Sequence, residues 1–87
     1  MESASEAEEI LEQIRRIARE ELEIAHAFSV EDELSGRLAL DSMQMLTLAV
    51  RLENHFLVKL REEDSAGIHT VGDLVALVKL RKEEARP

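Results

Sequence analysis

The apolar residues in the first third of the chain recur at intervals of three and four, the spacing of an amphipathic α-helix over residues 5–23. Charged residues occupy the positions between them, so one face suits a core and the other suits solvent. Ser5 and Glu8 have capping-box spacing at the start of this helix, and Ser3 and Glu6 are an alternative pair. The apolar stripe comprises Ile10, Leu11, Ile14, Ile17, Ala18 and Leu22.

The helical periodicity stops after this segment. Residues 25–41 mix isolated apolar residues with charges and a glycine, which predicts a long ordered loop held by its apolar side chains. Long connections in small domains are uncommon and often functional, and this one leads directly to Asp41 and Ser42. The residues expected to anchor the loop are Phe28, Val30, Leu34, Leu38 and Leu40.

Two further helical segments are predicted in the C-terminal part of the chain. A short helical turn is expected over residues 62–66, followed by a helix over residues 71–82. Thr70 and Asp73 have capping-box spacing at its start, and the charged residues after position 82 are expected to fray. The apolar stripe of this last helix comprises Val71, Leu74, Val75 and Val78.

The helix predicted over residues 42–57 carries more apolar surface than a small bundle can bury. Met43, Leu46 and Val50 follow helical spacing on a face rotated away from the core face, and we call these three residues the outward strip. An exposed apolar strip usually marks a binding surface; the alternative is that the loop at residues 26–40 covers it. The core face comprises Met45, Leu48, Ala49, Leu52 and Phe56.

Composition favours a single all-α domain. Leu, Ile, Val, Ala and Met supply most of the apolar residues, Phe28 and Phe56 are the only aromatics, and the one proline is Pro87. Because Leu, Ala and Met favour helix and no internal proline interrupts it, residues 1–87 are expected to form one small three-to-four-helix bundle. A chain of 87 residues has little room for an enclosed active site, which disfavours an enzyme acting alone.

The charge balance and the absence of cysteine limit the kinds of partner and of chemistry that this chain can have. Nineteen acidic and eleven basic residues give a formal net charge of −8, which repels nucleic acid and anionic membrane surfaces. Without cysteine there is no disulfide, thiolate nucleophile or Cys-based zinc site. No signal peptide or apolar run of about 20 residues is present. We therefore expect a soluble, cytoplasmic monomer that inserts into no membrane.

Catalytic and metal-binding interpretations find little support. Ser42 and Asp41 could be combined on paper with His26, His55 or His69, but an adjacent serine and aspartate do not form a catalytic relay. No histidine or acidic cluster has the ligand spacing of a zinc or calcium site. We expect no catalytic residue and no metal site.

Asp41 and Ser42 both suit the N-cap of the helix that follows, because their side-chain oxygens can accept bonds from the first-turn amides. The alternative is that Ser42 is a site of covalent modification. A phosphate at this position would meet free backbone amides and the positive end of the helix dipole, although the neighbouring Asp41 carboxylate would repel it.

The order of elements around these residues resembles the acyl carrier protein family. The chain reads long helix, long loop, "LALDSM", an apolar-rich helix ending "LENHF", a short connector and "IHTVGDLVALV". The most specific part is Asp41-Ser42-Met43, which is similar to the family's Asp-Ser-Leu. The match covers nearly the whole chain, and it implies a helical bundle of acyl-carrier type.

The resemblance implies a carrier and no enzyme. Ser42 would bear a 4′-phosphopantetheine arm, taken from coenzyme A by a phosphopantetheinyl transferase that recognises Asp41. The arm would hold acyl intermediates as thioesters, and the protein, a free-standing chain, would shuttle this acyl cargo between acyl-transfer and synthase enzymes of fatty-acid, polyketide or specialised lipid synthesis. The resemblance implies that these partners dock on the outward strip and on Glu53.

Several positions depart from the family pattern. Ala39 stands where a glycine is common, and the second helix lacks several of the acidic residues typical of fatty-acid carriers, so apolar contacts would carry more of the docking. The runner-up interpretation is a small helical adaptor that uses the same strip and carries no prosthetic group. The residues that replace the usual acids, or add a base, are Gln44, Thr47, Arg51 and Asn54.

Overall fold

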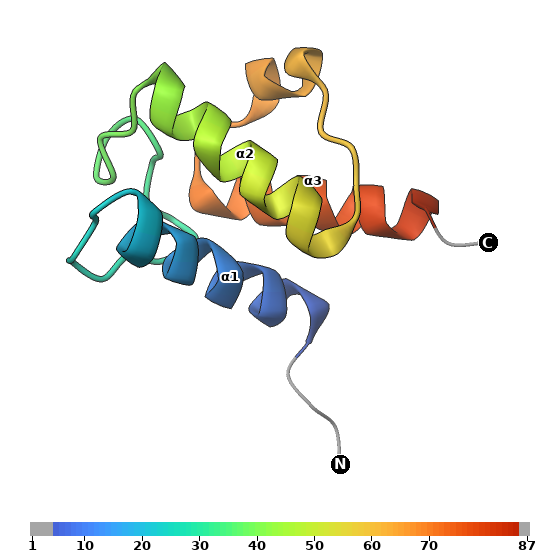
Figure 1. The fold of residues 1–87 in the computed structure, drawn as a ribbon, viewed down its shortest axis with the longest axis horizontal. Helices are drawn as coiled ribbons and strands as arrows, with labels where there is room; N and C mark the ends of the chain where they lie inside the picture. The colour runs from blue at the N-terminus through green and yellow to red at the C-terminus, as the bar shows by residue number, and fades with distance from the viewer. Residues whose placement is uncertain (1–4, 86–87) are drawn as a thin grey trace.

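The computed structural model describes residues 5–85 as a bundle of helices joined by one long loop and one short connector (Figure 1). Within these residues no strand forms beyond a single antiparallel bridge between Glu33 and Thr70, which confirms the all-α prediction. No helix in this part of the chain is long and apolar enough to cross a membrane. The elements are α1 (Glu6–Glu21), α2 (Ser42–Phe56), the 3-10 helix η1 (Glu62–Gly67) and α3 (Val71–Ala85).

The start of α1 is the capping box predicted from Ser5 and Glu8. The Glu8 amide donates to Ser5 Oγ at 3.2 Å, and the Ser5 amide donates to Glu8 Oε1 at 3.3 Å. The alternative cap at Ser3 lies outside the described residues. The helix ends at Glu21, two residues before the expected position, because Glu23 adopts a left-handed backbone with φ of 59°.

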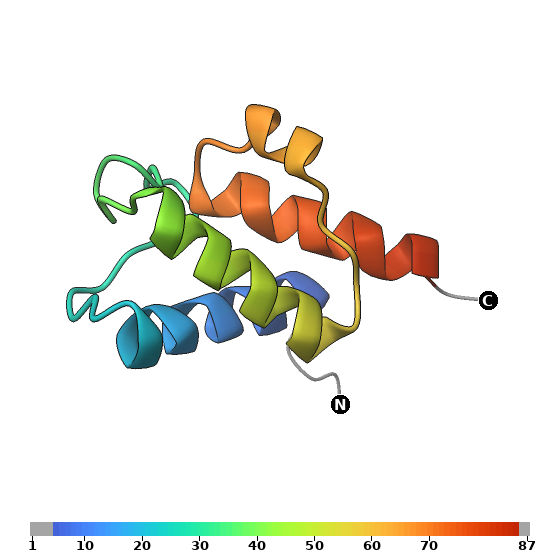
Figure 2. The same cartoon turned by 45° about the horizontal axis from the view of Figure 1, so that its top comes forward.

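The core forms between the apolar stripes of α1 and α3 and one face of α2. Both predicted stripes are buried, except that Leu11 of α1 is only partly so. α1 packs against α2 and against α3, whereas α2 and α3 approach each other less closely. In both views η1 lies on the side of the bundle away from α1 (Figures 1 and 2). The looser contact between α2 and α3 leaves space for the groove described below.

The long loop is ordered and anchored as expected, with one exception. Phe28, Leu34, Leu38 and Leu40 are buried, but the side chain of Val30 is exposed, so its predicted anchoring role is wrong. Its backbone does the anchoring instead, because its carbonyl accepts a 2.8 Å bond from the amide of Gly72 in α3. A Cβ at position 72 would meet that carbonyl oxygen at 3.1 Å, so glycine permits this close approach.

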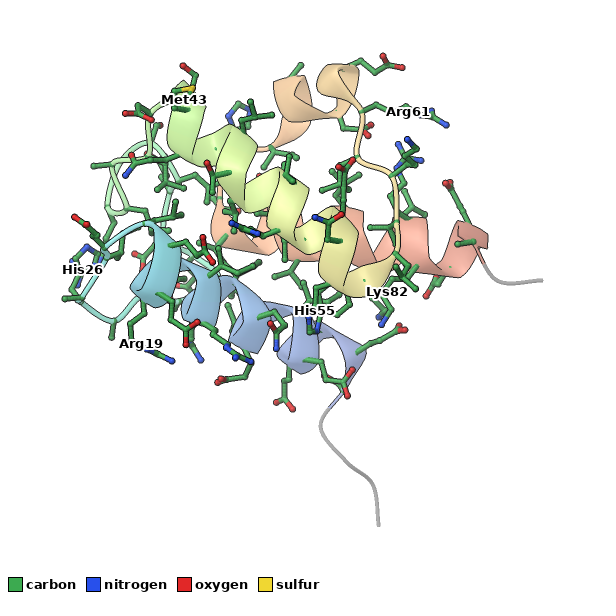
Figure 3. All side chains as sticks on the ribbon, in the orientation of Figure 1. Arg19, His26, Met43, His55, Arg61 and Lys82 are labelled. Atoms are coloured by element: carbon green, nitrogen blue, oxygen red, sulfur yellow. The ribbon has the colours of Figure 1, made fainter. Side chains whose placement is uncertain are left out.

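The last helix continues to Ala85, so the expectation that the charged tail frays is wrong for residues 83–85. Arg86 and Pro87, the last residues of that expected tail, lie outside the described residues. Residues 83–85 contain no helix breaker, and tertiary contacts hold the last turns of the helix. Lys82 Nζ lies 3.2 Å from Glu6 Oε2 of α1 and 5.0 Å from the centroid of the Phe56 ring in α2. Figure 3 shows Lys82 beside the end of α2. These contacts link all three long helices at one end of the bundle.

Candidate functional site

Asp41 caps α2, and Ser42 is the first residue of that helix. Asp41 Oδ1 accepts a 2.8 Å bond from the amide of Gln44, and Gln44 Oε1 accepts a 3.1 Å bond from the amide of Asp41. The Asp41 carbonyl accepts from the amide of Met45 at 2.9 Å. The sequence left the cap open between two residues; the structure assigns it to Asp41 through a capping box completed by glutamine.

The Ser42 side chain is exposed and is not needed for the cap. As the first two amides of the helix, those of Ser42 and Met43 have no acceptor within it, and they lie at the positive end of the dipole. A phosphodiester on Ser42 Oγ would therefore find hydrogen-bond donors beside it. The Asp41 carboxylate is held by the amide of Gln44. These residues fit a covalently attached phosphate group.

The outward strip is exposed along the first half of α2. Met43 is 71% exposed, Leu46 60% and Val50 41%. The loop at residues 26–40 therefore does not cover these side chains, and the covered alternative is wrong. Figure 3 shows Met43 at the outer end of α2. On the opposite side of the same helix, Leu48 and Leu52 are fully buried.

Glu53, which the sequence analysis grouped with the outward strip, is less exposed than the three residues of that strip. Its side chain is half-buried, and its Oε2 accepts a 2.7 Å bond from the amide of Leu60 in the connector. The carboxylate thus anchors the chain that leaves α2. Leu57, which the sequence analysis did not single out, is 83% exposed and ends the helix with a left-handed φ of 58°. No sequence signal marks it, because leucine is not typical of that conformation.

The surroundings of the strip carry little acidic charge. The first turn of α2 holds no acidic residue, and Thr47 donates its hydroxyl to the Met43 carbonyl at 3.0 Å. Arg51 pairs with Glu21 at the end of α1, at 3.2 Å. By contrast, the first turn of α1 alone contains three glutamates. The net negative charge of the chain is therefore displaced from the exposed side of α2.

A groove of about 640 Å³ opens between α2, α3 and the connector that contains η1, and Ser42 lies on its lining. This volume is typical of small-molecule sites. The sequence could not predict the groove, because segments far apart in the chain form it. Its lining comprises Leu34, Ser35, Leu40, Ser42, Met43, Met45, Leu46, Leu48, Ala49, Leu60, Arg61, Ile68, His69, Leu74 and Leu77.

The histidines do not assemble a catalytic site with Ser42. His69 lines the same groove, but no hydrogen bond joins it to Ser42 anywhere in residues 5–85. His55 packs edge-on against Phe56 near the other end of α2, with ring centroids 4.7 Å apart. In the same described range, no group of three or more His, Cys, Asp or Glu side chains is placed to hold a metal ion. In this part of the chain Ser42 therefore has no histidine partner of the kind that a serine hydrolase uses.

Comparison with known proteins agrees with this geometry. A family model described as the phosphopantetheine attachment site matches residues 12–78. The acyl carrier protein of Rhodococcus erythropolis is 38% identical over 85 residues, which cover 97% of this chain and 87% of that protein. The meromycolate extension acyl carrier protein of Mycobacterium tuberculosis is 38% identical over 76 residues, 87% of this chain. The matched part spans 61% of the length of that mycobacterial protein.

A solved structure shares the arrangement of helices. The crystal structure of an acyl carrier protein from Thermotoga maritima superimposes with a TM-score of 0.84, over 98% of this chain and 100% of that chain. The two sequences are 21% identical, so this likeness bears on the fold alone. The sequence matches therefore show the family, and the structural match shows the same fold.

Proposed function

Because the chain belongs to the acyl carrier protein family, whose prosthetic group is 4′-phosphopantetheine, we propose that Ser42 is the residue to which this group is attached. Proteins of this family are carriers and not enzymes, and they work with synthase and acyl-transfer enzymes. The observation that carries the proposal is the exposed Ser42 side chain at the first position of α2, with the cap made by its neighbour.

The residues around Ser42 have separate tasks in this proposal. Ser42 Oγ forms the phosphodiester, and the amides of Ser42 and Met43 stabilise its charge. Asp41 keeps the helix start in place and presents its carboxylate to a phosphopantetheinyl transferase. When attached, the prosthetic group supplies a terminal thiol that holds an acyl group as a thioester. The chain itself has no cysteine to supply one.

Partner enzymes dock on the outward strip in this proposal. Its three side chains are exposed apolar surface directly after the modified residue, and buried apolar contact is the main source of binding energy at the centre of an interface. Since the first turn of α2 lacks acidic residues, partners that rely on a basic patch gain less here. Glu53 adds its remaining carboxylate oxygen at the edge of this surface.

The groove accepts part of the acyl cargo. Its lining is mostly aliphatic and includes Ser42, so a chain attached there can turn inward between α2 and α3. Burial of methylene groups stabilises such a state by about 0.8 kcal/mol each. The names of two relatives, a meromycolate extension acyl carrier protein and an acyl carrier protein, support a place in lipid synthesis. In this proposal the carrier works in the cytoplasm, on intermediates of fatty-acid, polyketide or specialised lipid synthesis.

Incubation with coenzyme A and a broad-specificity phosphopantetheinyl transferase, followed by intact-mass measurement, tests the proposal. The wild-type chain should gain the mass of one phosphopantetheinyl group, and Ser42→Ala should gain none. Ser35→Ala is the matched control, because Ser35 is an exposed serine on the same groove but not at a helix start.

Circular dichroism of Ser42→Ala should show a folded protein, because Asp41 retains the cap. No mass gain with several transferases would overturn the proposal. That outcome would favour an adaptor that binds partners through the outward strip and carries no prosthetic group.

A further inference from the structure

One wall of the groove is the connector that contains η1, and an ion pair fastens it to α3. Arg81 Nη2 lies 2.8 Å from Asp64 Oδ1 and 2.9 Å from Asp64 Oδ2. The two side chains are only 13% and 16% exposed. Seventeen positions separate them in sequence, so the pair joins η1 to the second half of α3.

Each partner of this pair is held in place by a second contact. Asp64 Oδ2 accepts a 3.0 Å bond from the amide of Arg61, which closes the start of η1. This amide and, next, the Arg81 guanidinium lower the pKa of Asp64 below its ordinary value near 3.8, so the carboxylate stays charged at neutral pH. Arg81 Nη1 donates to Glu84 Oε1 at 2.7 Å. Arg81 therefore approaches Asp64 in one defined orientation.

The ion pair lies beside the lining of the groove. Arg81 follows Leu77 by four positions, one helical turn, and Leu77 belongs to the lining. The connector contributes Leu60 and Ile68 to that lining on either side of η1. Movement of η1 away from α3 would therefore widen the groove at this end.

Few other bonds hold this wall within the described residues. Its beginning is held by the bond from the Leu60 amide to Glu53, and its end by the Asp73 carboxylate, which accepts from the amides of His69 and Thr70. Between these two anchors, the Asp64–Arg81 pair joins η1 to a long helix. Its loss would leave the wall held by the apolar side chains of Leu60 and Ile68, on either side of η1.

We propose that the Asp64–Arg81 ion pair determines the length of acyl chain that the groove holds. The inference rests on the proposed function, since it requires cargo in the groove. With the pair intact, the wall stays against α3 and favours chains that end within the groove. With the pair broken, the wall moves outward, longer chains enter, and shorter chains make fewer contacts. Arg81 and Asp64 are thus positioning residues for the cargo.

A series of acyl thioesters tests this proposal. The holo proteins are loaded with saturated chains from hexanoyl to hexadecanoyl, and the rate of thioester cleavage by hydroxylamine is measured for each. Wild type should show greatest protection at one chain length. Arg81→Met should move this maximum to a longer chain and reduce protection of the shorter chains by up to about fivefold, the upper end of the range expected for loss of one ion pair.

Lys82→Met is the matched control. This substitution breaks the neighbouring ion pair between Lys82 and Glu6, which holds α3 to α1. Neither residue of that pair lines the groove. The substitution should leave the chain-length profile of wild type unchanged, even where its melting temperature falls as far as that of Arg81→Met. Arg81→Lys, which keeps the charge, should give a profile between wild type and Arg81→Met.

Asp64→Asn provides a second route if Arg81→Met does not fold, because it removes the charge while keeping an oxygen for the Arg61 amide. It should move the maximum in the same direction. An unchanged profile in both variants, or a wild type with no dependence on chain length, would overturn the inference. Failure of the proposed function differs from this result, since the intact mass would then show no phosphopantetheinyl group to load.

Discussion

The two faces of α2 carry similar apolar side chains, but one face is buried in the core and the other is exposed to solvent. Leu48 and Leu52 are buried against the other helices, whereas Met43 and Leu46 are mostly exposed to solvent. Burial of a leucine contributes about 1.5–3 kcal/mol to the free energy of folding. The exposed residues contribute little of this stabilisation. Although the core of this chain is small, the apolar side chains of Met43 and Leu46, directly after Ser42, are not part of it.

The difference teaches that amphipathic spacing alone does not assign a role to a helical face. Both sets follow three-and-four spacing, and only their neighbours distinguish them. The inner face meets α1 and the core, while the outer face meets solvent along the strip. Mutations on the two faces should therefore separate stability from partner recognition. The predictions below run from the largest to the smallest expected effect on stability.

Leu52→Ala should cause the largest loss of stability. Leu52 is fully buried, and removing its side chain leaves a cavity in the core, with an expected cost of about 2–5 kcal/mol in the free energy of unfolding. Urea unfolding followed by circular dichroism measures this cost. A loss below about 1 kcal/mol would contradict the assignment of this face to the core.

Acidification should destabilise the side of the groove opposite α2. The amides of His69 and Thr70 lower the pKa of Asp73, as the amide of Arg61 does first for Asp64. Because the folded pKa lies below the unfolded value near 3.8, each carboxylate stabilises the fold above that value. The stabilisation is lost as the pH falls through the folded pKa.

The melting temperature should therefore fall as the pH is lowered below about 4. This loss should be smaller than that of Leu52→Ala, because neither carboxylate lies in the apolar core. Asp73→Asn should show a shallower fall than wild type. An equally steep fall in that variant would show that Asp73 does not contribute to it.

Ala39→Gly should stabilise the protein by about 0.5–1 kcal/mol. Ala39 has a left-handed φ of 54°, a conformation that costs an L-residue about 1–2 kcal/mol and glycine little, while glycine loses more backbone entropy on folding. Thermal unfolding measures the gain. Transfer of phosphopantetheine to Ser42 should proceed at an unchanged rate, because this turn precedes the outward strip without belonging to it.

Leu46→Ala should have the smallest effect on stability and a clear effect on docking. Leu46 is exposed, so the free energy of unfolding should change by no more than about 0.5 kcal/mol. The kcat/KM of the transferase for this carrier should fall about fivefold or more, as for loss of a contact at the centre of an interface. Leu80→Ala, an exposed leucine on α3, is the control and should leave kcat/KM unchanged.

The elements that depend on residues close together in the sequence, such as helical stripes and caps, could be predicted well. The stripe of α1 and its capping box at Ser5 and Glu8 follow from residues within a few positions of one another, and the stripe of α3 does so too. Asp41 and Ser42 could be selected as cap candidates for the same reason, since a helix start needs only neighbouring residues. The left-handed φ of Ala39 gives a physical reason for the glycine that is common there.

The errors lie where distant residues decide the outcome. α3 extends to Ala85 because Lys82 contacts two other helices, and the frayed end expected from its charges does not form. The side chain of Val30 is exposed, and the bond that holds this residue to α3 runs from the Gly72 amide to the Val30 carbonyl. A distant residue also acts on Glu53, because its carboxylate accepts a bond from the Leu60 amide of the connector; its part in the docking surface stays a prediction.

The sequence by itself determined the helical class, the cap candidates and the apolar stripes, because each depends on chain-local spacing and side-chain chemistry. The choice of Ser42 as the modified residue rests on the resemblance of the whole chain to the carrier family, and it stays a prediction. Only the tertiary structure decided that the outward strip is uncovered, that Asp41 is the cap, and that a groove opens beside Ser42. It also brought Arg81 to Asp64. Burial, cavities and long-range ion pairs arise where separate segments meet, and spacing along one segment does not encode where another segment will lie.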